Sequence, residues 1–173
     1  MENQTNNKSI ILNYGLILGF ISILPGIVKY AIGGDFLEED MVTGSIGIIA
    51  SIALVVLAIK KCKSNNNGFL SWGEGLKIGM GVVVISMIIS LCYLLIFTNL
   101  IEPNFKQLAI EKTEQQWIES GMSDEQIEIS RDMVSKYFNL SLFGSIVIMS
   151  LFFGFIISAI SSAIMKKTEE TDF

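Results

Sequence analysis

The sequence predicts an all-α fold: a bundle of four transmembrane helices, with both termini in the cytoplasm and a helical extracytoplasmic segment between spans three and four. Hydrophobic residues make up 51% of the 173 residues, and charged residues only 17%, below the quarter usual in soluble domains. The apolar residues gather in four long runs, and lysines cluster at the ends of these runs that are expected to face the cytoplasm. Length, apolarity and charge placement therefore all indicate a membrane protein.

A helix needs about 20 apolar residues to cross a hydrocarbon core about 30 Å thick. The four expected spans, within one integral membrane domain over the whole chain, are residues 10–32, 42–59, 76–101 and 140–165. The third is the clearest, with eleven Val, Ile, Leu or Phe residues and no charge between Gly81 and Phe97. Each such residue near the centre favours insertion by roughly 0.3–0.6 kcal/mol, so the run contributes about 3–7 kcal/mol.

The flanking charges predict the orientation. The lysines at span ends are Lys60, Lys61, Lys63, Lys166 and Lys167. The loop at residues 33–41 has no Lys or Arg and four acids, which are Asp35, Glu38, Glu39 and Asp40. Because cytoplasmic loops carry the excess of Lys and Arg, we expect both termini inside, and residues 33–41 and 102–138 outside.

Residues 102–138 are expected to form a small helical hairpin. A polar helix should run over residues 104–119, because Pro103 is well placed at a helix start. Ser120 and Gly121 stop it, and Ser123 with Gln126 has the spacing of a capping box for a second helix that continues into span four. This hairpin could be a sensor or partner-docking surface. We favour a solvated linker, since mixed charges on helices are usually a wet face.

Small residues at spacing four predict where helices approach closely. The candidates are Gly15 and Gly19 in span one, Gly75 and Gly79 at the start of span three, and Ser150, Gly154, Ser158 and Ser162 in span four. Ser86 and Ser90 continue the row in span three. The span-four row predicts a tight contact along the inner half of that helix. We favour packing within the bundle over the alternative, a homodimer contact.

The turn before span three is the best-defined local motif. Ser71 and Glu74 have capping-box spacing, and Trp72 fits a membrane-interface anchor. The functional alternative is a re-entrant or ligand-contacting turn with Glu74 as its charged group. We prefer the cap, because it explains all three residues together.

The sequence contains no recognisable catalytic, cofactor-binding or metal-binding constellation. It has no His, and the four spans hold only Lys29 and Lys77 as charged residues, both near span ends. The lack of Asp or Glu at any span centre argues against ion-coupled transport. The net charge of -5 argues against nucleic-acid binding. Cys62, between two lysines, could be reactive but is more often incidental.

Several of these features occur together in one pattern: the turn Ser71-Trp72-Gly73-Glu74, Pro103 after span three, the turn Gly121-Met122-Ser123, and a serine-rich last span ending in Lys166-Lys167. In this pattern the chain resembles an uncharacterised family of small membrane proteins found mainly in Bacteroidota, domain of unknown function 4199, over nearly its whole length. The resemblance implies the architecture and a membrane location, here multi-pass in the bacterial cytoplasmic (inner) membrane. It implies no activity and transfers no catalytic residue.

Two kinds of function remain open. The first is a non-enzymatic structural or accessory protein, embedded in the lipid bilayer and acting through helix packing with itself or with a membrane-protein partner. The alternative is a passive channel or carrier for a small solute or lipid, which requires a polar cavity built from hydroxyls, Asn13 and glycines. An enzyme would require Glu74 or Cys62 to face a cleft with a polar partner.

Overall fold

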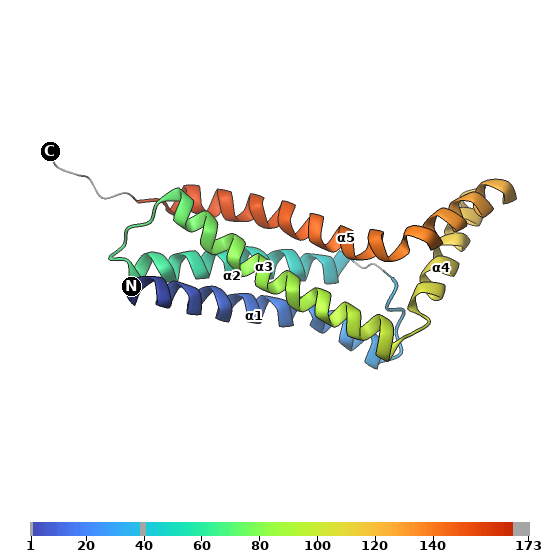
Figure 1. Ribbon diagram of the computed structural model, residues 1–173, viewed down its shortest axis with the longest axis horizontal. Helices are drawn as coiled ribbons and strands as arrows, with labels where there is room; N and C mark the ends of the chain where they lie inside the picture. The colour runs from blue at the N-terminus through green and yellow to red at the C-terminus, as the bar shows by residue number, and fades with distance from the viewer. Residues whose placement is uncertain (1, 39–40, 168–173) are drawn as a thin grey trace. The chain divides into compact units, whose positions relative to one another are not determined.

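A computed structural model describes residues 2–38 and 41–167 of the chain (Figure 1). Its elements are α1 (Glu2–Ala31), α2 (Met41–Asn65), α3 (Trp72–Ile96), a π-helical segment η1 (Phe97–Ile101), α4 (Phe105–Glu119) and α5 (Asp124–Met165). Over these residues the fold is all-α, with one isolated pair of antiparallel backbone hydrogen bonds between Leu70 and Lys167. The chain divides into two compact units, which we call the bundle unit (Met1–Ser90 with Val147–Phe173) and the hairpin unit (Leu91–Ile146).

Four helices in the described residues are long and apolar enough to cross a membrane. They are Asn7–Ala31, Gly44–Asn65, Trp72–Ile101 and Asp124–Met165. Each overlaps one span expected from the sequence, and the second and fourth extend well beyond it. The second continues past Ile59 because the lysines at a span end favour helix as much as apolar residues do. The fourth has 42 residues, about twice the length needed to cross the hydrocarbon core.

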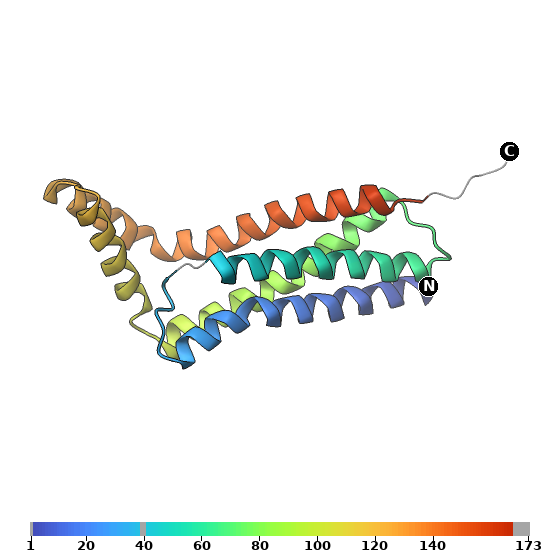
Figure 2. The same ribbon diagram turned by 180° about the vertical axis from the view of Figure 1, so that it is seen from behind.

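The start of α1, the connection between α2 and α3, and the end of α5 lie at the same end of the bundle unit (Figure 2). Here the Nζ of Lys63 donates a 2.7 Å hydrogen bond to the carbonyl oxygen of Met165, near the last turn of α5. A lysine at this position complements the negative end of the helix dipole. Leu70 and Lys167 exchange two backbone hydrogen bonds of 2.9 Å beside it. We call this the terminal end of the bundle unit.

The core of the bundle unit lies toward this terminal end. Its fully buried large side chains are Val55, Ile59 and Cys62 from α2 and Val82 from α3. Cys62 is 1% exposed and belongs to the buried core, so its thiol is shielded from solvent in this conformation despite the neighbouring lysines, in line with the favoured view that it is incidental. At the opposite end, the Nζ of Lys29 donates a 2.7 Å hydrogen bond to the carbonyl of Glu38. Glu39 and Asp40 of the acidic loop lie outside the described residues.

The hairpin unit contains the helical hairpin that the sequence predicts. α4 ends at Glu119, Gly121 has φ +80°, and α5 begins at Asp124. The capping box is formed: the backbone N–H and the hydroxyl of Ser123 lie 3.1 and 3.2 Å from Oε1 of Gln126. The backbone conformation at Gly121 is one that side chains with a Cβ rarely adopt, which explains why glycine ends α4.

One feature of the hairpin unit departs from expectation. Span three was expected to be one α-helix to residue 101, but its last turn, Phe97–Ile101, is π-helical. Here Oγ1 of Thr98 and Nδ2 of Asn99 donate to the carbonyls of Leu94 and Leu95 at 2.9 and 2.8 Å. Side-chain donors that compete for backbone carbonyls favour such a distortion. The hydropathy pattern contains no signal of it.

Candidate functional site

The predicted small-residue rows are contact points within the chain. A Cβ added at Gly15 or Gly19 of α1 would lie 2.5 Å from Ile85 or Ile89 of α3. Near the start of α3, a Cβ at Gly75 would lie 2.6 Å from the hydroxyl of Ser162 in α5. Real Cβ atoms do not come this close, so only glycine permits these approaches. α3 therefore approaches both α1 and α5 closely.

The row in α5 is divided between two environments. Ser158 and Ser162 are fully buried, and a Cβ on Gly79 of α3 would lie 2.7 Å from the Cβ of Ser158. Gly154 approaches Val83 in the same way, at 2.5 Å. Gly154, Ser158 and Ser162 therefore pack against α3 within the chain, and the same surface is not free to contact a second copy. Ser150, one turn further from the terminal end, instead lines a cavity described below.

The turn before α3 is a helix cap. The backbone N–H and hydroxyl of Ser71 donate to Oε2 of Glu74 at 2.9 and 2.8 Å, and the N–H of Glu74 donates to the Ser71 hydroxyl at 3.3 Å. The indole N–H of Trp72 donates to the carbonyl of Ala159 at 3.2 Å, so this turn also holds the start of α3 against α5. Reciprocal bonding of this kind satisfies the unpaired donors at a helix start.

Glu74 and Cys62 do line one small cavity of about 120 Å³, at the terminal end of the bundle unit. Its other polar residues are Asn7, Asn65 and Asn66. One carboxylate oxygen of Glu74 is already occupied by both Ser71 donors. In the described residues no group of three His, Cys, Asp or Glu could hold a metal ion. The cavity therefore lies beside the capped start of α3 and is lined largely by polar side chains.

A second cavity lies in the half of the bundle unit distant from the terminal end and is lined by serines from all four spanning helices. Its volume is about 200 Å³, room for several water molecules. The serines are Ser22 of α1, Ser51 of α2, Ser86 and Ser90 of α3, and Ser150 of α5. The other lining residues are Leu18, Val83, Met87, Phe153, Gly154 and Ile157, so no charged side chain lines it.

The five hydroxyls differ in their hydrogen bonding. Ser22 and Ser51 each donate to a backbone carbonyl four residues earlier, at 2.8 Å. In the described part of the chain, the hydroxyls of Ser86, Ser90 and Ser150 form no hydrogen bond. Ser86 is only 7% exposed. A hydroxyl offers one donor and two acceptor sites, so this cavity has unused hydrogen-bonding capacity in an apolar setting.

Sequence reasoning found only part of this site. Ser86, Ser90 and Ser150 stand in rows of small residues, where they were assigned to packing. Ser22 and Ser51 were not singled out, because a lone serine in an apolar helix is common and its depth relative to other helices is not visible in one sequence. One feature of the sequence could have indicated the cavity: every span carries a serine in the half that is distant from the terminal end.

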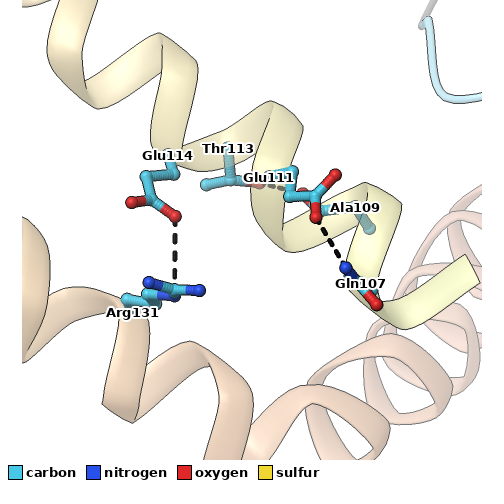
Figure 3. Close-up of polar contacts among 6 residues, drawn as sticks. All are labelled: Gln107, Ala109, Glu111, Thr113, Glu114 and Arg131. Atoms are coloured by element: carbon cyan, nitrogen blue, oxygen red, sulfur yellow. Dashed lines mark hydrogen bonds and ion pairs between the residues drawn. The ribbon is translucent and has the colours of Figure 1, made fainter. Parts of the chain in front are cut away.

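The hairpin unit offers a charged surface rather than an enclosed site. Nε of Arg131 in α5 lies 3.5 Å from Oε2 of Glu114 in α4, and Gln107 donates to Glu111 at 2.8 Å (Figure 3). The rings of Phe105 and Phe138 meet edge to face, with centroids 6.2 Å apart. These contacts hold two helices together with a small apolar core.

That core predicts the effect of a substitution in the hairpin unit. Ile127 is 8% exposed, so Ile127→Ala should cost about 2–5 kcal/mol. We expect hydrogen–deuterium exchange to become faster over residues 105–138 and to stay unchanged over residues 72–90, which belong to the other unit. Ile129→Ala, at a residue 60% exposed on the same helix, is the matched control and should change neither region. Equal loss of protection in both regions would contradict two separate units.

The fold and these sites define an all-helical chain with the four apolar helices of a multi-pass membrane protein. The chain belongs to the family described as protein of unknown function (DUF4199), which matches residues 13–167 and so confirms the resemblance seen in the sequence. It shows no significant similarity to any curated protein or to any solved structure.

Proposed function

We propose that this chain is a non-enzymatic structural or accessory protein of the bacterial inner membrane that acts by packing against another transmembrane helix. The observation that carries the proposal is a pair of glycines on α2. Nothing in the described chain lies within 4 Å of where a Cβ of Gly44 or Gly47 would be. Gly73 of α3 and Gly144 of α5 are also open, but Gly44 and Gly47 are three residues apart and so lie on one face of α2. In contrast, Gly15, Gly19, Gly75, Gly79 and Gly154 all have a close neighbour on another helix.

Gly44 and Gly47 lower the stability of helix α2 unless a packing contact compensates for them. Glycine inside a helix is about 0.5–1 kcal/mol less stable than alanine. Close packing offsets this cost at the internal contacts, whereas no contact within the chain offsets it at Gly44 and Gly47. A helix from a second copy, or from a partner, would approach closely at this face of α2, because small residues permit that contact in a membrane.

Photo-cross-linking in native membranes tests the proposal. With a photoreactive side chain at position 47 we expect one discrete adduct, at twice the 19.1 kDa chain mass for a second copy or at another single mass for a partner. Position 49, also on α2 but about 200° away from position 47 around the helix, is the matched control and should give none. Gly44→Leu should abolish the adduct. The absence of any protein adduct at position 47 would contradict the proposal.

The serine-lined cavity favours a second candidate, a carrier for a small solute or lipid. Fully buried Val55, Ile59 and Val82 lie between this cavity and the terminal end, so the bundle unit is closed on that side in this conformation. Transport would therefore require a second conformation rather than a standing pore. Efflux of glycerol from vesicles that contain the protein, reduced to the empty-vesicle rate by Ser86→Leu, would support this candidate, and efflux at the empty-vesicle rate with the unmodified protein would remove it.

A further inference from the structure

Three hydroxyl groups in the bundle cavity lack partners while two others do not. Ser22 and Ser51 satisfy their hydroxyl protons on their own helices, whereas Ser86, Ser90 and Ser150 form no hydrogen bond within the described chain. Ser86 is more than nine-tenths buried. A hydroxyl offers one donor and two acceptor sites, so the cavity presents both kinds of hydrogen-bonding site to whatever occupies it.

The charge of the lining selects the class of ligand. No Lys, Arg, Asp or Glu lines the cavity, and moving an ion into such a site without a counter-charge costs several kcal/mol. A neutral hydroxyl group needs no counter-charge and matches serine on both donor and acceptor sides. The cavity therefore fits an uncharged hydroxyl-bearing group better than a phosphate, a carboxylate or an ammonium group.

The apolar half of the lining indicates what is attached to that hydroxyl. Leu18, Val83, Met87 and Ile157 cover the remaining wall. Ser22 and Phe153 lie at the surface of the bundle unit as well as in the cavity lining, and Phe153 is 53% exposed. In the spanning part of a membrane protein that surface meets lipid chains. A neutral lipid can therefore reach the serines from the side.

We infer that the serine-lined cavity binds an uncharged hydroxyl group, supplied either by the head of a neutral lipid such as a diacylglycerol or by a free polyol. The three partnerless serine hydroxyls bind the hydroxyl, and the apolar wall contacts the first carbons attached to it. This inference deepens the carrier candidate and rests on the same cavity, but it concerns binding alone.

Native mass spectrometry of the purified full-length protein tests the inference. The probes are 1,2-dioleoylglycerol, dioleoylphosphatidic acid, which has the same chains and a charged head without an alcohol hydroxyl, and glycerol. We expect one dioleoylglycerol or one glycerol bound per chain, with phosphatidic acid at least tenfold weaker. Ser86→Ala and Ser90→Ala should each weaken binding about fivefold, the loss of one hydrogen bond between neutral groups. Ser45→Ala is the control, because Ser45 is exposed and bonds Met41.

The possible results distinguish a lipid from a free polyol as the ligand, and they distinguish the binding inference from the carrier candidate. Binding of dioleoylglycerol but not glycerol identifies a lipid, and the reverse identifies a polyol; both support the inference. Equal binding of the anionic lipid, equal binding by Ser86→Ala, Ser90→Ala and Ser45→Ala, or no binding of either neutral probe would overturn it. Binding without glycerol efflux would end the carrier candidate and leave the inference standing.

Discussion

Replacing Gly79 with leucine will separate α3 from α5 and leave too little correctly folded protein to purify as a single species. A Cβ at this position would meet the Cβ of Ser158 at 2.7 Å and Cγ1 of Val55 at 3.1 Å. Both neighbours belong to the fully buried core, so neither can move without displacing a helix. Overpacking a close contact typically costs about 1–3 kcal/mol, and leucine adds three further carbons beyond the Cβ.

The measurement is size-exclusion chromatography of detergent extracts, followed by thermal unfolding of whatever elutes as a single peak. Gly144→Leu is the matched control: it is the same change in another span, at a helical position with nothing within 4 Å. It should elute normally, with a melting temperature no lower than that of the unmodified chain. If Gly79→Leu behaves like Gly144→Leu, the packing described for α3 and α5 is wrong.

A compensating pair makes the test sharper. Gly79→Ser alone should be destabilised, and adding Ser158→Gly should restore much of the loss, because the pair moves the hydroxymethyl group from one side of the contact to the other. The coupling between directly contacting residues is typically about 0.5–3 kcal/mol. Combining Gly79→Ser with Ser45→Gly, which removes a hydroxyl elsewhere, should restore nothing.

The sequence predicted the elements whose cause is local. The caps at Ser71 and Ser123 depend on a residue three positions away, and both form as expected. The hairpin with its turn at Gly121 is equally local, because one glycine with a positive φ ends α4. The four apolar helices follow from length and hydropathy, which need no knowledge of neighbours.

The features that sequence reasoning missed arise from contacts between distant segments. The bond from Lys63 to Met165 joins residues 102 positions apart, and no pattern in a single chain indicates that pairing. The serine cavity likewise exists only because Ser22, Ser51 and Ser150 come to one level of three different helices. The row of small residues in α5 predicted a contact with another helix, whereas its division between a packed part and a cavity has no signal in a single sequence.

The second large effect concerns the side of the membrane on which each loop lies. A cysteine on the accessible side reacts with a membrane-impermeant reagent, and one on the other side does not. With Cys62 and Cys92 replaced by alanine, single cysteines would be introduced as Glu38→Cys, Ser64→Cys and Ser120→Cys, all at exposed positions. The positive-inside rule and an even number of crossings predict that positions 38 and 120 lie outside and position 64 in the cytoplasm. Ser64→Cys is a near-isosteric change in the last turn of α2, so it should not disturb the fold.

The most direct test of four membrane crossings is therefore reaction of these three variants with a membrane-impermeant maleimide in sealed bacterial spheroplasts. We predict that Glu38→Cys and Ser120→Cys react within minutes, and that Ser64→Cys reacts only after the membrane is permeabilised. The inverse pattern would keep the four crossings and reverse the proposed orientation. Equal labelling of positions 38 and 64 in sealed cells would show that α2 does not cross the membrane and would contradict the four-span bundle itself.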